Sequence, residues 1–111
     1  MERTIKESDW KLLSGLRTVA LERFSERVLL EMTALASDKS RTSHERYKAV
    51  FKLMQDRDNH LAGAFDDMRR STAFFKLAAI HHLRLLTEEE MEQFTPETRE
   101  IIRMLTGGEH T

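Results

Sequence analysis

The sequence predicts an all-α protein built on a long antiparallel helical hairpin, and three observations favour this fold. No stretch alternates apolar and polar residues with the period of two that is typical of a β-strand. Residues of high helix propensity dominate, and the 111 residues include only one proline and four glycines. Apolar residues recur at spacings of three and four over long segments, which is the spacing of one face of an α-helix.

The first predicted helix covers residues 9–36, with Ser8 or Asp9 as its N-cap. Gly15 lies inside it and costs about 1 kcal/mol relative to alanine, which a helix of this length tolerates. The apolar residues cover more than half of the circumference, so the helix must contact at least two others. They are Trp10, Leu12, Leu13, Leu16, Val19, Ala20, Leu21, Phe24, Val28, Met32 and Leu35.

The second predicted helix follows a polar connector and covers residues 43–86. It starts at Ser43 without a capping box, because Arg46 stands where a glutamate would be needed. Its apolar positions repeat every 3.5 residues on average, the period of left-handed helix packing, and this seam is expected to face the first helix. The seam consists of Tyr47, Phe51, Met54, Asp58, Leu61, Phe65, Met68, Thr72, Phe75, Ala79, His82 and Leu86.

Two short helices are predicted near the C-terminus. Thr87 followed by Glu90 forms a capping box, which predicts a helix over residues 88–94. Pro96 suits the first position of the next helix, which is expected over residues 96–105. The helices together predict a helical bundle.

The length of the second helix predicts a homodimer. An unbroken helix over residues 43–86 would be about 60 Å long, whereas a compact domain of this size has a radius of gyration of about 13 Å. Its last part is apolar on nearly all sides and extends beyond the first helix, so a second copy is expected to cover it. A break near Gly63 is the alternative and would give a compact monomer. The residues predicted for the dimer interface are Phe74, Phe75, Leu77, Ala78, Ile80 and His81.

Several polar residues stand at apolar positions. Asp58 interrupts the seam, and the hairpin brings it within about one turn of Arg17. Arg27 and Glu31 are spaced as an i,i+4 pair on the apolar face of the first helix. We interpret both pairs as ion pairs that fix the helix register. The alternative is a polar pocket for a small molecule or a metal, to which His82 would also contribute.

Charge is distributed unevenly along the chain. The formal net charge is −1, but residues 37–86 carry ten basic and six acidic groups, and residues 87–111 carry two basic and seven acidic groups. The acidic C-terminal helices are therefore expected to lie on the second helix. Nucleic acid is not an expected partner, because the chain lacks a strongly basic face. A transcriptional regulator remains an alternative, although its only candidate helix-turn-helix, residues 88–105, is acidic.

Several function classes have no support in the sequence. The absence of cysteine excludes disulfides, thiolate metal sites and a thiol nucleophile. There is no phosphate-binding glycine loop, nucleophile elbow, HExxH or Glu-x-x-His motif, so neither a cofactor nor a metal nor an enzymatic activity is predicted. No signal peptide or run of 18 apolar residues occurs, so a cytoplasmic location without membrane contact is expected.

The expected function is that of an interaction or regulatory module. We predict one all-helical domain over residues 1–111, with a flexible tail at residues 106–111, that acts as a homodimer and binds another macromolecule through its helical faces. The protein partner is not identified by any motif.

Overall fold

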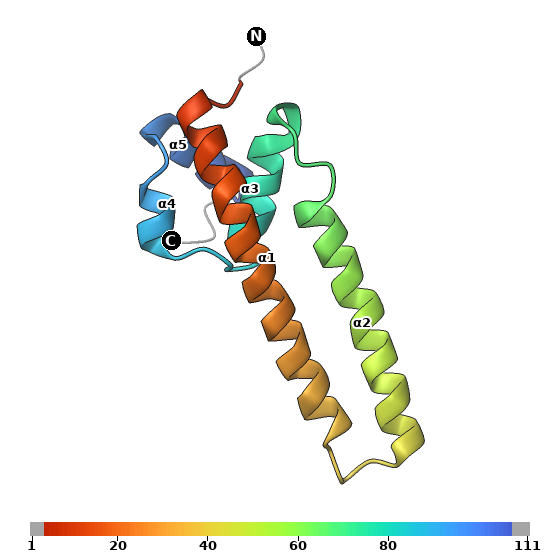
Figure 1. The fold of residues 1–111 in the computed structure, drawn as a ribbon. Helices are drawn as coiled ribbons and strands as arrows, with labels where there is room; N and C mark the ends of the chain where they lie inside the picture. Colours follow the sequence, from red (N-terminus) through yellow and green to blue (C-terminus); the bar gives the residue numbers. More distant parts are fainter. Residues whose placement is uncertain (1–3, 108–111) are drawn as a thin grey trace.

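The computed structural model describes residues 4–107, and over this range the protein is all-α. The molecule is elongated, with principal extents of 55 × 27 × 24 Å and a radius of gyration of 16.7 Å. Figure 1 shows two long antiparallel helices that extend from a cluster of shorter ones. The helices are α1 (Glu7–Ala36), α2 (Ser43–Phe65), a short 3₁₀ helix (Arg70–Thr72), α3 (Ala73–His82), α4 (Glu88–Glu92) and α5 (Pro96–Leu105).

The starts of the two long helices differ in detail from the prediction. Helix α1 begins at Glu7 with Lys6 as its N-cap, so Asp9 lies in the first turn rather than at the cap. Helix α2 begins at Ser43 as predicted, but it does have a capping box. Thr42 is the N-cap, its hydroxyl accepts from the Glu45 amide at 3.1 Å, and the Glu45 carboxylate accepts from the Thr42 amide at 2.8 Å.

The prediction of one helix over residues 43–86 is wrong, because α2 ends at Phe65. Asp66 takes an extended conformation and Asp67 a left-handed one with φ of 57°. The Thr72 hydroxyl donates to the Asp67 carbonyl at 2.6 Å and so fixes the turn. The break lies two residues beyond Gly63, close to the position that the sequence analysis gave as the alternative to a continuous helix.

The physical reason for the break is the burial of α3. Reversal after Phe65 brings Ala73, Leu77 and Ile80 into the interior, where each is fully buried. Phe65 itself packs edge-to-face on Phe24, with ring centroids 6.1 Å apart. Helix α3 is covered by α1, α2 and α5, so the apolar overhang that predicted a dimer does not exist.

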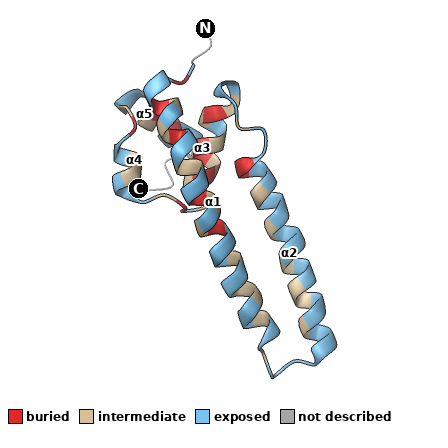
Figure 2. Ribbon diagram, viewed as in Figure 1, coloured by how far each residue is buried: buried red, intermediate tan, exposed pale blue. Residues whose placement is uncertain are grey.

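Burial divides the molecule into two regions, which we call the head and the arm. The head, residues 4–24 and 64–107, contains every buried residue in the described part of the chain. The arm, residues 25–63, is the outer part of the α1–α2 hairpin and contains none. Figure 2 shows this contrast, with buried residues confined to the end of the molecule where α3, α4 and α5 gather.

The two C-terminal helices belong to the head. The predicted Thr87–Glu90 capping box is present at the start of α4, and Pro96 occupies the first turn of α5. Helix α5 packs on α3. Of the predicted tail, Thr106 donates from its hydroxyl to the Ile102 carbonyl at 2.9 Å, and residues 108–111 lie outside the described range.

Candidate interaction surface

The arm presents an open apolar face on α2. The residues of α2 that turn toward α1 are only partly buried, namely Arg46, Val50, Leu53 and Arg57. A second stripe starts one residue later and therefore lies about a quarter turn around the helix. Tyr47 is 68% exposed and Phe51 54% exposed on this stripe. The stripe consists of Tyr47, Phe51, Met54 and Asp58.

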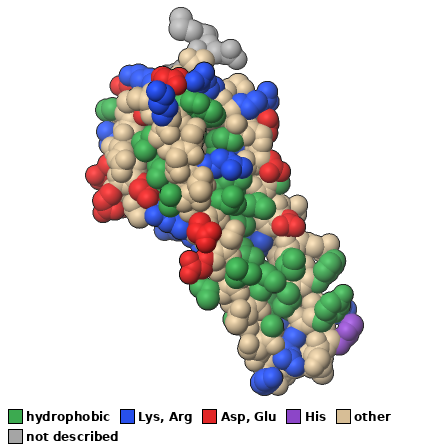
Figure 3. Space-filling model, viewed as in Figure 1, with side chains coloured by type: hydrophobic (Ala, Val, Ile, Leu, Met, Phe, Trp, Pro, Cys, Tyr) green, Lys and Arg blue, Asp and Glu red, His purple; other side chains and the backbone are tan. Residues whose placement is uncertain are grey.

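Helix α1 adds a matching stripe to the same face. Ser25, Leu29 and Met32 are spaced at i, i+4 and i+7, and Leu29 is 60% exposed. A groove of about 320 Å³ runs between the two stripes. It is lined by Leu21, Phe24, Ser25, Val28, Leu29 and Met32 of α1 and by Met54, Arg57, Asp58 and Leu61 of α2. Figure 3 shows hydrophobic side chains gathered over the arm.

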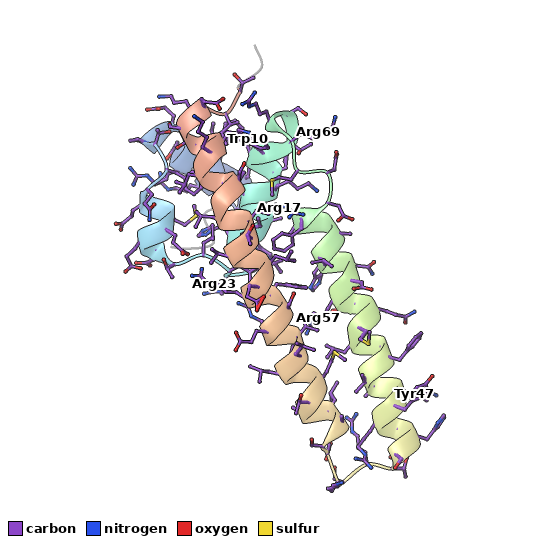
Figure 4. All side chains as sticks on the ribbon, viewed as in Figure 1. Trp10, Arg17, Arg23, Tyr47, Arg57 and Arg69 are labelled. Carbon is purple, nitrogen blue, oxygen red and sulfur yellow. The ribbon has the colours of Figure 1, made fainter. Side chains whose placement is uncertain are left out.

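The predicted seam of α2 therefore lies on the open face over its first half, rather than against α1. The stripe that does meet α1 carries two arginines, and for this reason the sequence pattern does not mark it as a contact. Arg46 donates to the Ala36 carbonyl at 2.7 Å. Arg57 lies between the two helices, as Figure 4 shows, and binds both carboxylate oxygens of Glu31 at 3.1 and 2.8 Å.

The predicted Arg27–Glu31 pair is replaced by two other interactions. Glu31 is held by Arg57 of α2, and the hydrogen bond and charge of that guanidinium keep the pKa of Glu31 below its usual value. Arg27 instead donates to the carbonyls of Leu83 at 2.6 Å and Arg84 at 3.0 Å, beyond the C-terminal end of α3.

The predicted Arg17–Asp58 pair does not form. Arg17 donates to the Phe65 carbonyl at 3.0 Å, and its guanidinium carbon lies 5.7 Å from the centre of the Phe65 ring. Figure 4 shows Arg17 on α1 near the end of α2. Asp58 is exposed at the edge of the groove and makes no hydrogen bond or ion pair with the residues described. The assumed hairpin register was wrong: it places residue 48 opposite Glu31, whereas Glu31 meets Arg57, nine residues or about two and a half turns farther along α2.

The residues predicted for a dimer interface are distributed over the head. Leu77, Ala78 and Ile80 are buried within their own chain and cannot meet a second copy. Phe74 is partly buried, and Phe75 is 65% exposed. His81 lines a hollow with Met91 and Arg99, whereas His82 lines another with Phe75 and Leu105, far from Asp58 in the arm. His82 and Asp58 therefore do not share a pocket.

A buried carboxylate that the sequence did not reveal joins the two ends of the head. Asp9 is only 1% exposed. It accepts hydrogen bonds from the Thr95 amide at 3.1 Å and from the hydroxyls of Thr95 and Thr98 at 2.6 Å. Burial alone would raise the pKa of Asp9, but these hydrogen bonds outweigh it and lower the pKa. The partners are far away in sequence, so no local pattern could have predicted this contact.

A second long-range contact holds α4 on α1. Arg23 binds both oxygens of Glu90, at 2.7 and 3.0 Å, and also donates to the Leu85 carbonyl at 2.8 Å. The hydrogen bond from Arg23 lowers the pKa of Glu90 to about 2. Glu90 thus serves both the local capping box and the tertiary structure. These contacts explain the head, and they leave the arm unexplained.

Comparisons with protein families, with curated proteins and with solved structures gave no match. Within residues 4–107, no three His, Asp or Glu side chains cluster so that they could hold a metal ion. No helix in the described part of the chain is both long and apolar enough to span a bilayer. The open face of the arm is therefore the feature from which a function has to be inferred.

Proposed function

We propose that the protein is a non-enzymatic interaction module whose arm binds α-helices of a partner protein. One observation carries this proposal: the arm contains no buried residue, yet it holds large apolar side chains at helical spacing on one face of both its helices. Exposed apolar surfaces of this extent mark sites of association in water-soluble regions of proteins.

The geometry of the arm favours helices as the bound element. Two antiparallel helices with a shared apolar face form half of a four-helix bundle, and two further helices complete it. The stripes at i, i+4 and i+7 match the way an amphipathic helix packs into a groove. The groove between Leu29 and Met54 supplies the holes for such packing.

Charge defines the chemistry of the partner further. Residues 37–52 carry five basic and two acidic groups, a balance of +3. Residues 53–63, the rest of α2 in the arm, carry one basic and two acidic groups, a balance of −1. A partner helix that lies along the arm should therefore be acidic at the end over the tip and close to neutral or weakly basic at the end near the head.

A photo-cross-linking experiment tests this proposal. The full chain carries a photoreactive phenylalanine analogue in place of Phe51 and is irradiated in cells of its native host. We expect a discrete cross-linked protein band, because Phe51 stands at the centre of the open stripe.

Leu30 provides the matched control, since it is 65% exposed on α1 but follows Leu29 by one residue and so lies about 100° around the helix from the α1 stripe. The same analogue at Leu30 should give no such band. If neither position gives a discrete band, or if both give the same one, the arm face is not a binding surface and the proposal fails.

A further inference from the structure

We infer that the partner of the arm is a second copy of this chain, packed antiparallel about a two-fold axis to form a four-helix bundle. This inference rests on the proposed function, since it names the occupant of the same face. The physical requirements for that occupant are few: paired helices, an apolar stripe and a charge gradient. The arm itself meets all of them.

The charge gradient favours a second copy in the antiparallel orientation. When two arms lie antiparallel and are centred near Phe51 and Met54, the basic part of each α2, residues 37–52, faces the weakly acidic part of the other, residues 53–63. A parallel arrangement would place like charges together along the whole arm. A self-complementary patch of this kind is what a two-fold interface requires.

The α2 stripe is in register with itself in this arrangement. On α2, Phe51 of each copy faces Met54 of the other, and Tyr47 faces Asp58. The α1 stripe, with Leu29 and Met32, extends the same apolar face beside it.

This pairing also accounts for Asp58. In one chain it is an exposed carboxylate without a polar partner among the described residues, next to an apolar groove. In the antiparallel dimer it faces the phenol of Tyr47, whose hydroxyl is a hydrogen-bond donor. A single polar position in an otherwise apolar seam fixes the register and orientation of packed helices.

The area available is sufficient for a specific dimer. The part of α2 in the arm, residues 43–63, is about 30 Å long, and the two helices side by side are about 20 Å wide. Pressing two such faces together removes on the order of 1,200 Å² from water, which is within the range of specific protein interfaces.

Sedimentation equilibrium on the full chain across the micromolar range is the first test. We expect twice the mass of one chain for the unchanged protein. Phe51→Glu should weaken the dimer by about 100-fold or more, because it places a charge at the centre of the interface twice. Leu30→Glu changes a similarly exposed residue that lies about 100° around α1 from Leu29, off the stripe, and should leave the dimer intact. Circular dichroism verifies that both variants fold.

Disulfide trapping tests the orientation, and the chain is suited to it because it contains no cysteine. Mixing Tyr47→Cys with Asp58→Cys under mild oxidation should give a disulfide-linked heterodimer. Each variant alone should not cross-link, because identical positions lie at opposite ends of an antiparallel pair.

Three results would overturn this inference: a monomer throughout the concentration range, equal loss of the dimer in Leu30→Glu and Phe51→Glu, or efficient self-linking of Tyr47→Cys, which indicates a parallel pair. The same experiments distinguish failure of this inference from failure of the proposed function. A monomer that is nevertheless cross-linked at Phe51 to a different protein retains the proposed function and refutes the second copy as partner. A monomer without any cross-link refutes both.

Discussion

Arginine side chains bind the backbone carbonyls at several helix C-termini of this protein. Neither α1 nor α2 has a basic residue in its last turn. Instead, four arginines of neighbouring helices donate hydrogen bonds to carbonyls at or just beyond helix C-termini. They are Arg17, Arg23, Arg27 and Arg46. The main accepting carbonyls are those of Phe65, Leu85, Leu83 and Ala36, respectively. Such carbonyls have no partner within their own helix and carry partial negative charge, so a guanidinium both satisfies and stabilises them.

Asp9 has the opposite role, since it serves the N-terminal end of α5. We predict that Asp9→Ala lowers the free energy of unfolding by about 3 kcal/mol, because it leaves the Thr95 amide and two threonine hydroxyls without their charged acceptor. Urea denaturation measures the change. Glu22→Ala removes an exposed carboxylate from the same helix and should change stability by less than about 0.5 kcal/mol; equal effects of the two changes would contradict the assigned role.

Glu90 should make the head sensitive to acid. Its pKa in the folded protein, about 2, lies below the usual value of 4.5. The resulting stabilisation is complete above about pH 5 and is lost as the pH falls toward 2. We expect this group to contribute on the order of 2 kcal/mol, a figure that allows for the 37% exposure of the Arg23 side chain.

Urea denaturation at a series of pH values from neutral to acidic measures this dependence. Glu90→Gln should be less stable at neutral pH and should show a flatter decline in acid. A variant with the same pH profile as the unchanged protein would show that Arg23 does not hold Glu90 ionised.

At the scale of the helices, the two glycines within the long helices offer a direct test of helix propensity. A β-carbon added at Gly15 or Gly63 would meet no atom within 4 Å, so alanine should fit without strain. Each substitution should raise the stability by about 0.5–1 kcal/mol. Gly107, with φ of +66°, is the contrast: Gly107→Ala should cost about 1 kcal/mol. Thermal unfolding measures all three, and a loss of stability in Gly63→Ala would contradict the helical role of Gly63.

Most helix boundaries were predictable, because they depend on local signals. The capping box of Thr87 and Glu90 and the position of Pro96 mark α4 and α5 directly. The box at Thr42 and Glu45 was missed because the cap was placed one residue late, at Ser43. These features need only neighbouring residues to be recognised.

The reversal after Phe65 could not be predicted in the same way. No proline or exposed glycine run marks it, and Asp67 adopts a conformation that few non-glycine residues prefer. It is favoured because it buries Leu77 and Ile80 of α3 between α1, α2 and α5, which are distant in the sequence or separated by the turn. The stripe of α2 that meets α1 was also missed. It carries Arg46 and Arg57, whose hydrogen-bond partners, the Ala36 carbonyl and Glu31, lie on α1 and are not visible in the local sequence pattern.

At the scale of the whole molecule, stability should differ between the head and the arm. The arm has no buried residue, so its backbone hydrogen bonds have little tertiary protection. In Phe51→Glu, amide hydrogens of residues 43–58 should exchange with solvent much faster than those of α3, as measured by mass spectrometry. Comparable protection in both regions would show that the isolated arm is stable by itself.

The separation of arm and head has a consequence for variation in length. The tip of the hairpin, residues 37–42, is remote from the head (Figure 1). Seven residues make almost two full turns, so removing or inserting one heptad in each arm helix at facing levels would change the reach by about 10 Å while keeping every side chain on its original face. The distance between the tip and the head can therefore be changed in steps of one heptad while the packing of the head is kept.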